Sequence, residues 1–500
     1  MKPIVTRLLL VFVSMVVLLS CATTVGSAER DRGEQRATSM LTPDDAELER
    51  LDGVVTVVWG NARPGGPALA EERFFLREAS GAETELLIAP DLVRAAGGSR
   101  RLSGRAVEVR LTSARLADAK RNPEIAVVVR SLRILPDRSG TKATKAVGGP
   151  QPWVSILCKF SDVTNEPKSL SYFDSMYSSS YPGLDHYWRE LSYDNANVSG
   201  STAVAWVTLP QPVSHYASSG GGDLSALLAD CTAAADPYVF FPNFVGINMM
   251  FNDDFGPYAW GGRQWVSLDG QSKIYRVTWE PPWGYGNVAV IAHEMGHGFG
   301  LPHSNNADGD SSPYDNPWDV MSDSWYWALH DSTYGTVGKG TIGHHLDILG
   351  WIAPAEKLDI DSTGIYTATV DNLELESTTN LRLVTVQIPD STMYYTVEVR
   401  DRTGYDGNLP DFAVVIHEVW PSRKEEAWLV DPVDPVNGAD EGAMWRVGEC
   451  FEDATNEIEI CVQSVTAGGF TLKVFYGDAG NIFTDGFEGG GTGSWSIISP

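Results

Sequence analysis

The stretch NVAVIAHEMGHGFGLPHS, residues 287–304, holds three of the nine histidines of a 500-residue chain. His293 and His297 are four residues apart, so on a helix they share one face and lie about one turn from each other. Both imidazoles can then bind the same ion, while Glu294 lies beside that ion without being obliged to bind it. Asn287 suits the N-cap position of such a helix. The spacing therefore predicts a helix that carries a metal site.

The third histidine, His303, reaches the same ion only if the chain turns sharply after His297. Gly298 and Gly300 are expected to supply the backbone freedom for that turn, with Gly300 just past the helix end. Pro302 then prevents the helix from resuming. Three neutral imidazoles with one open coordination position are typical of a catalytic zinc site. The five fixed letters of HExxHxxGxxH should occur by chance on the order of 10⁻⁵ times in such a chain.

The run H-E-M-G-H-G-F-G-L-P-H, residues 293–303, resembles the motif of the metzincin zinc metallopeptidases. Metzincins also have a methionine turn beneath the metal, and Met321 in YDNPWDVMSDSW follows His303 by eighteen residues. Some metzincins have a tyrosine ligand two residues after that methionine. This chain has Asp323 there, so that role is not carried over, and Tyr326 is the remaining candidate for binding the substrate carbonyl.

The resemblance covers roughly Trp153 to Gly477. The segments YPGLDHYWRELSY, VAWVTLP, WDVMS and LDILGWI, together with YYTVEVRDRTGYDGNLPDFAVVIHEVW, look like the gametolysin-like and immune-inhibitor-A-like secreted bacterial metalloproteases. This likeness implies an α/β metzincin-type catalytic domain with Zn²⁺ as its cofactor and Glu294 as its catalytic residue.

Several acidic residues follow the motif. Each ligand histidine needs an acceptor for its other ring N–H, and Asp319 and Asp323 are candidates, although solvated loop acids are an equal alternative. Asp308, Asp310 and Asp315 gather on an apparent loop. Oxygen-rich loops can hold a structural Ca²⁺, but this loop lacks the spacing of a known calcium loop, so calcium stays an open alternative.

The first residues have the pattern of an export signal. Lys2 and Arg7 precede a short apolar run, which is too short to span a bilayer comfortably. Two processing routes compete: a signal peptide over residues 1–28, or a lipoprotein signal over residues 1–20 that leaves Cys21 lipidated. We therefore expect an extracellular protein, or one anchored at the cell envelope through Cys21. Residues 29–47 read as a flexible tether.

Five strand-like segments follow within about 90 residues, at 53–61, 72–79, 83–89, 105–114 and 125–135. They predict a small, OB-like β-barrel over residues 48–136. Nothing in it converges on chemistry, so we interpret it as a spacer or pro-domain. Some zinc proteases are kept latent by a cysteine of a pro-region, but no cysteine lies between Cys21 and Cys158. A loop-like linker over residues 137–152 ends this part.

Alternating strand and helix patterns then fill residues 153–355, the predicted zinc peptidase domain. Period-two alternation between turns over residues 356–479 predicts an all-β sandwich. Residues 480–500 form a Gly/Ser-rich tail. The sequence thus predicts a multidomain chain in which a barrel, an α/β domain and a β domain follow one another.

Charge and cysteine content narrow the possibilities. A net charge of −28 argues against a nucleic-acid partner, which requires a basic face. Either processing route takes Cys21 out of the disulfide count and leaves four cysteines, which we expect to pair as Cys158 with Cys231 and Cys450 with Cys461, free buried thiols being the alternative. The remaining histidines, among them His186, His344, His345 and His417, are expected to be structural.

The resulting hypothesis is a secreted zinc-dependent endopeptidase that acts on protein or peptide substrates through a water activated by the metal, with Glu294 as general base. A membrane would be involved only through the N-terminal lipid anchor. One alternative is a cell-surface binding or adhesin protein with an inactive peptidase-like domain. Another is a zinc hydrolase that acts on bonds other than peptide bonds.

Overall fold

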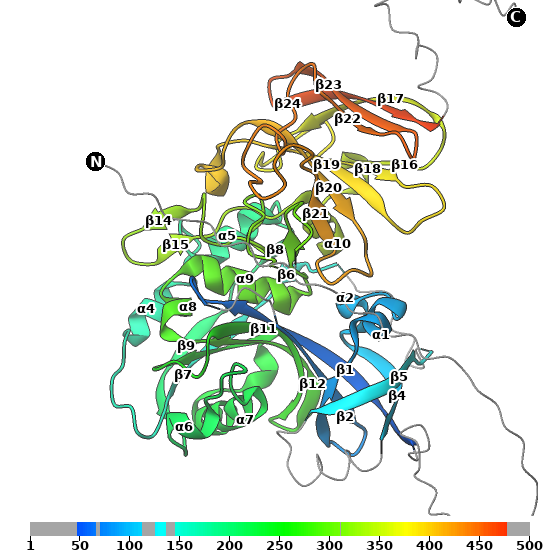
Figure 1. Ribbon diagram of the computed structural model, residues 1–500. Helices are drawn as coiled ribbons and strands as arrows, with labels where there is room; N and C mark the ends of the chain where they lie inside the picture. The colour runs from blue at the N-terminus through cyan, green and yellow to red at the C-terminus, as the bar shows by residue number, and fades with distance from the viewer. Residues whose placement is uncertain (1–47, 67–70, 113–125, 137–145, 311, 478–500) are drawn as a thin grey trace, which may run out of the picture. The chain divides into compact units, whose positions relative to one another are not determined.

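The computed structural model describes residues 48–66, 71–112, 126–136, 146–310 and 312–477 (Figure 1). The predicted export signal, the tether, most of the predicted linker and the C-terminal tail lie outside these residues. In the described ranges, no helix is long and apolar enough to cross a membrane.

The N-terminal region forms a closed five-stranded β-barrel, as the sequence predicted. The order β2-β3-β5-β4-β1 is closed by a further pairing of β1 with β2. The barrel consists of β1 Leu48–Ala62, β2 Glu71–Glu78, β3 Glu83–Leu87, β4 Arg105–Thr112 and β5 Val127–Ile134, with short helices α1 Pro90–Ala95 and α2 Ser99–Leu102. Branched and aromatic side chains alternate along these strands, and their inward members form one buried cluster.

The barrel is not structurally separate from the next region, because β1 extends beyond it and joins the sheet of that region. The second half of β1 pairs antiparallel with β11, from Val58 opposite Gly262 to Ala62 opposite Tyr258. One ten-stranded sheet results, in the order β2-β3-β5-β4-β1-β11-β12-β10-β7-β9. Figure 1 shows β1 running between the barrel strands and β11. The sequence did not predict this junction.

We call residues 146–355 the central region. Its sheet comprises β11 Tyr258–Leu268, β12 Gln271–Glu280, β10 Gly246–Phe251, β7 Trp153–Lys159 and β9 Thr202–Thr208. The last four strands run parallel, and β11 is antiparallel to β12. Both residues of the β11–β12 turn, Asp269 and Gly270, have positive φ, which is the conformation that Asp-Gly hairpin turns favour. This hairpin was not among the predicted elements.

Helices cover both faces of the central sheet because alternate strand residues point to opposite sides. In β7, Leu157 packs into a cluster with α9 Val288–Phe299, α5 Leu184–Leu191 and α10 Gly343–Leu349. Its neighbour Ile156 packs into a second cluster with α7 Leu224–Ala235. The predicted Cys158–Cys231 disulfide is present and joins β7 to α7. The shorter helices of this region are α4 Leu170–Ser175, α6 Val213–Tyr216 and α8 Pro282–Tyr285.

Two further sheets share one hydrophobic cluster, and all of their strands except β13, which belongs to the central region, come from the C-terminal region. A six-stranded sheet has the order β13-β21-β20-β19-β18-β16, and a four-stranded sheet has the order β17-β24-β23-β22. Their strands are β13 Ser304–Asn305, β16 Lys357–Ile360, β17 Gly364–Asp371, β18 Leu383–Gln387, β19 Tyr394–Arg400, β20 Ala413–Val419, β21 Ala427–Leu429, β22 Cys450–Asp453, β23 Ile458–Val465 and β24 Gly469–Tyr476. The predicted Cys450–Cys461 disulfide links directly paired residues of β22 and β23.

Candidate metal centre

Helix α9 carries the histidine motif and lies against β11. Its start and end fall where the sequence predicted, but the expected N-cap hydrogen bond is not formed. Asn287 occupies the N-cap position without capping, since its Oδ1 accepts from the backbone of Thr336 instead. Gly300 ends the helix with a φ of 106°, a conformation that glycine adopts without strain.

The expectation that Gly298 also serves the turn is wrong. Gly298 lies inside the helix, and a Cβ there would come within 2.8 Å of the Trp153 ring. Gly298 is therefore required by close packing of α9 on the sheet, and the turn toward His303 begins at Gly300. Gly261 of β11 has a similar role, because a Cβ there would meet the Glu294 carbonyl oxygen at 2.2 Å.

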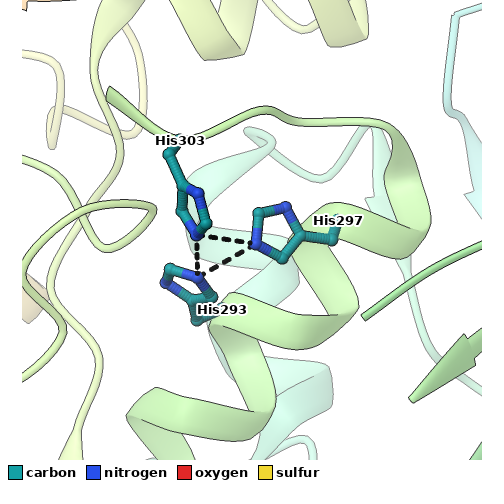
Figure 2. A group of neighbouring side chains, drawn as sticks. All are labelled: His293, His297 and His303. Atoms are coloured by element: carbon teal, nitrogen blue, oxygen red, sulfur yellow. Dashed lines mark hydrogen bonds between the residues drawn. The ribbon is translucent and has the colours of Figure 1, made fainter. Parts of the chain in front are cut away.

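The three histidines converge with their Nε2 atoms facing one another (Figure 2). The Nε2 of His293 lies 3.0 Å from that of His297 and 3.1 Å from that of His303, and the third separation is 3.2 Å. All three side chains are buried. A helix of i, i+4 spacing and a glycine-ended turn thus bring together the residues that the motif predicted.

The protonation of the rings explains why this cluster suits a cation. The Nδ1 of His293 donates to the Val320 carbonyl, and the Nδ1 of His297 donates to the Leu301 carbonyl, each at 2.7 Å. In the neutral imidazoles the two Nε2 atoms then carry only lone pairs, which cannot hydrogen-bond each other. A cation between them satisfies both. Two nitrogen ligands of a tetrahedral zinc ion lie about 3.3 Å apart, close to the observed separations.

Burial keeps these imidazoles neutral. It lowers the pKa of His293 to about 4, against the opposing effects of the Val320 hydrogen bond and of Asp319. The pKa values of His297 and His303 are lowered well below the usual range, first by burial and then by the neighbouring histidines. Neutral imidazole is the form that binds a metal.

Glu294 is fully buried, and neither carboxylate oxygen completes a hydrogen bond with a described residue. Burial, followed by the nearby Glu280 carboxylate, raises its pKa well above the usual range, while the Asn61 amide opposes this rise. The Asn61 amide nitrogen also completes no regular hydrogen bond in the described structure. An unpaired buried carboxylate beside converging imidazoles favours a cation there.

Met321 lies directly against α9. A Cβ at position 296 would clash with the Met321 thioether, so Gly296 lets the methionine lie against the helix without shifting. The preceding residue, Val320, supplies the carbonyl that orients His293. The segment thus supports the histidine cluster both through packing and through a hydrogen bond.

For His293 and His297, the prediction of Asp319 and Asp323 as ring N–H acceptors is wrong, because the acceptors are the Val320 and Leu301 carbonyls. Asp319 instead receives the hydroxyls of Ser304 and Thr341, at 2.6 and 2.7 Å, and pairs with His345 at 3.1 Å. These contacts keep the pKa of Asp319 below its usual range despite burial. Asp319 therefore links Ser304, which follows His303, to Thr341 and His345 at the start of α10.

Asp323 and Tyr326 lie in positions that differ from their expected roles. Asp323 accepts from the backbone nitrogens of Trp325 and Tyr326. The Tyr326 side chain is 74% exposed and does not join the histidine cluster. Tyr314, which the sequence analysis did not select, lies with its ring 5.8 Å from that of His303.

The N-terminal barrel covers the histidine cluster, contrary to the expectation that nothing in it converges on chemistry. The Trp59 ring of β1 stacks on His297, with centroids 5.2 Å apart and planes at 15°. Two residues further along the same face, Asn61 approaches Glu294. The Tyr314 hydroxyl donates to the Gly60 carbonyl and accepts from the Ala62 nitrogen.

The other predicted groups are as follows. Asp308, Asp310 and Asp315 each offer a carboxylate oxygen within 4.8 Å of the others, a grouping that could hold a metal ion. Burial, and then repulsion from Asp308, raises the pKa of Asp315 to about 7. Four of the six remaining histidines form hydrogen bonds with other residues: His186 with Tyr405, His344 with Glu426, His345 with Thr341 and His417 with Asn316.

Comparison with known proteins does not identify a relative of this chain. No protein-family model and no curated protein matches the chain.

Proposed function

We propose that this protein is a zinc-dependent endopeptidase of the metzincin type whose own barrel holds the site closed. The observation that carries the proposal is the convergence of three neutral imidazoles beside an unpaired buried carboxylate. His293, His297 and His303 would hold Zn²⁺, and the α/β central region and the two C-terminal sheets would be a metzincin domain and a β-sandwich.

When bound, zinc acidifies water and polarises a carbonyl group. Glu294 takes the proton from the attacking water and delivers it to the leaving amine nitrogen as the peptide bond breaks. The Val320 and Leu301 carbonyls fix the rings of His293 and His297, and Met321 packs against α9 at Gly296, between these two histidines in sequence.

The same arrangement explains why the site is closed. Without β1, β11 would be the edge strand of the central sheet, and edge strands accept extended peptides by antiparallel pairing. Residues 58–62 already occupy that edge, and Trp59 covers His297. Because His293, Glu294 and His297 are buried, a protein substrate reaches them only when β1 moves away.

Localisation follows the same proposal. Two disulfides fit an oxidising, extracellular environment. We propose secretion, with envelope anchoring through Cys21 as the alternative. The adhesin alternative gains no support, since a binding protein has no need of a carboxylate buried without partners at a cluster of metal-binding histidines.

The experiment measures hydrolysis of casein and of a quenched fluorescent peptide by the zinc-loaded full chain, before and after chelation and zinc re-addition. We expect slow, chelator-sensitive hydrolysis that Glu294→Gln abolishes while zinc stays bound. Hydrolysis that survives Glu294→Gln would contradict the assigned base. Hydrolysis of an ester substrate but of no peptide would favour the non-peptide hydrolase.

A further inference from the structure

A second site lies at the junction of barrel and central region. A cavity of about 200 Å³ is lined from the barrel side by Trp59, Arg100 and Ser103, and from the central region by Arg263 and Arg276 among others. Three arginines around one small cavity, with no carboxylate among the lining residues, require an explanation.

Two of these arginines have only neutral partners. Arg263 donates to the carbonyls of Gly298 and Phe299, at 3.2 and 2.7 Å. Arg276 donates to Gln151 Oε1 at 2.5 Å and lies over the Phe299 ring at 4.7 Å. Within the described residues neither guanidinium forms an ion pair. A charge removed from water without a counter-charge is costly, so these two groups favour an added anion.

The electrostatics of the cavity point the same way. Burial, followed by repulsion from Arg100, lowers the pKa of Arg263. Burial, followed by repulsion from Arg263, lowers the pKa of Arg276 to about 9. The acid nearest to Arg100 is Glu426, at 2.8 Å, and that carboxylate also contacts His344. It is therefore already committed, and the cavity keeps an excess of positive charge.

A buried hydroxyl completes the set. Ser103 is 8% exposed, and its Oγ has no hydrogen-bond partner in the described part of the chain. Planar guanidinium groups match the oxygens of phosphate or sulfate, and a hydroxyl adds a neutral donor.

We propose that this cavity binds one small tetrahedral oxyanion, held by Arg263 and Arg276 from the central region and by Arg100 and Ser103 from the barrel. Such an anion bridges the two regions, next to Gly300 and to the Trp59 that covers His297. The inference does not depend on the proposed peptidase activity, since it rests on the cavity and its donors alone.

The test is calorimetric titration of the full chain with inorganic phosphate in a buffer free of other oxyanions. We expect saturable binding of one phosphate per chain, competed by sulfate. Arg276→Gln and Arg263→Gln should each weaken it at least tenfold, because hydrogen bonds to charged groups are the strong ones. Arg133→Gln, at a side chain that is 63% exposed on the barrel, should leave it unchanged.

Thermal unfolding provides the second readout. Phosphate should raise the unfolding midpoint of the wild type and of Arg133→Gln, and raise that of Arg276→Gln less, as expected for a ligand of the folded state. Ser103→Ala, a mild change, should weaken binding even if an arginine variant folds poorly. No saturable phosphate binding, equal binding by all variants, or acetate binding as tight as phosphate would each overturn the assignment.

Discussion

If β1 holds the proposed peptidase closed, replacing Trp59 with alanine should raise its activity. The Trp59 side chain is 1% exposed, stacks on His297, and donates from Nε1 to Glu72 at 3.0 Å. Truncating a buried tryptophan to alanine costs about 3–5 kcal/mol. Part of this loss falls on the barrel itself, because Trp59 also belongs to the barrel core.

If roughly 2 kcal/mol of that loss destabilises only the closed form, in which β1 covers the histidines, the population of the open form rises about thirtyfold. The assay is the initial rate of hydrolysis of a quenched fluorescent peptide by the zinc-loaded full chain. Trp59→Phe is the matched control: it keeps an aromatic ring over His297 while it loses the hydrogen bond to Glu72 and part of the indole packing, so it should raise the rate much less than Trp59→Ala.

The double variant Trp59→Ala/Glu294→Gln should be inactive, which ties the gained rate to the proposed site. An unchanged or lower rate for Trp59→Ala, in a protein that remains folded and retains its zinc, would refute the claim that β1 closes the site.

Three further predictions concern stability and are checked by chemical denaturation. Asp319→Ala should destabilise the fold by about 3–5 kcal/mol, since it leaves His345 and two hydroxyls without their buried partner; a loss under 1 kcal/mol would contradict this role. Gly296→Ala should cost about 1–3 kcal/mol through the clash with Met321, and a neutral effect would show that the methionine can move. Burial raises the pKa of Glu72 from 4.5 to about 7, so the stability that its protonated form contributes should be lost as the pH rises from about 4.5 to 7. The free energy of unfolding of Glu72→Gln, relative to that of the wild type, should therefore increase by up to about 3 kcal/mol between pH 4.5 and pH 8. Parallel pH profiles of the two proteins would contradict the shift.

Local patterns in the sequence predicted much of this molecule. A helix and a turn could be predicted from the i, i+4 histidines, from Gly300 at the helix end and from Pro302 after it. These features act over a few residues only. Enrichment in branched residues between Gly, Pro and Asn likewise revealed the barrel strands. The β11–β12 hairpin was equally accessible through its Asp269–Gly270 turn and was overlooked.

Other features depend on contacts between distant residues and had no local signature. The pairing of Trp59 with Gly261 joins positions about two hundred residues apart, so the role of β1 as a cover over the histidines could not be read from either segment. Gly298 was assigned to a turn because a glycine required by packing and one required by conformation look alike in sequence. The ring N–H acceptors were mistaken because backbone carbonyls carry no side-chain signal.

The most direct test of the central claim is the zinc content of the purified full chain after zinc loading and dialysis, measured by inductively coupled plasma mass spectrometry. We expect one zinc per chain in the wild type and in Glu294→Gln, and none in His297→Ala. Zinc retained by a folded His297→Ala variant, or absent from the wild type, would contradict it.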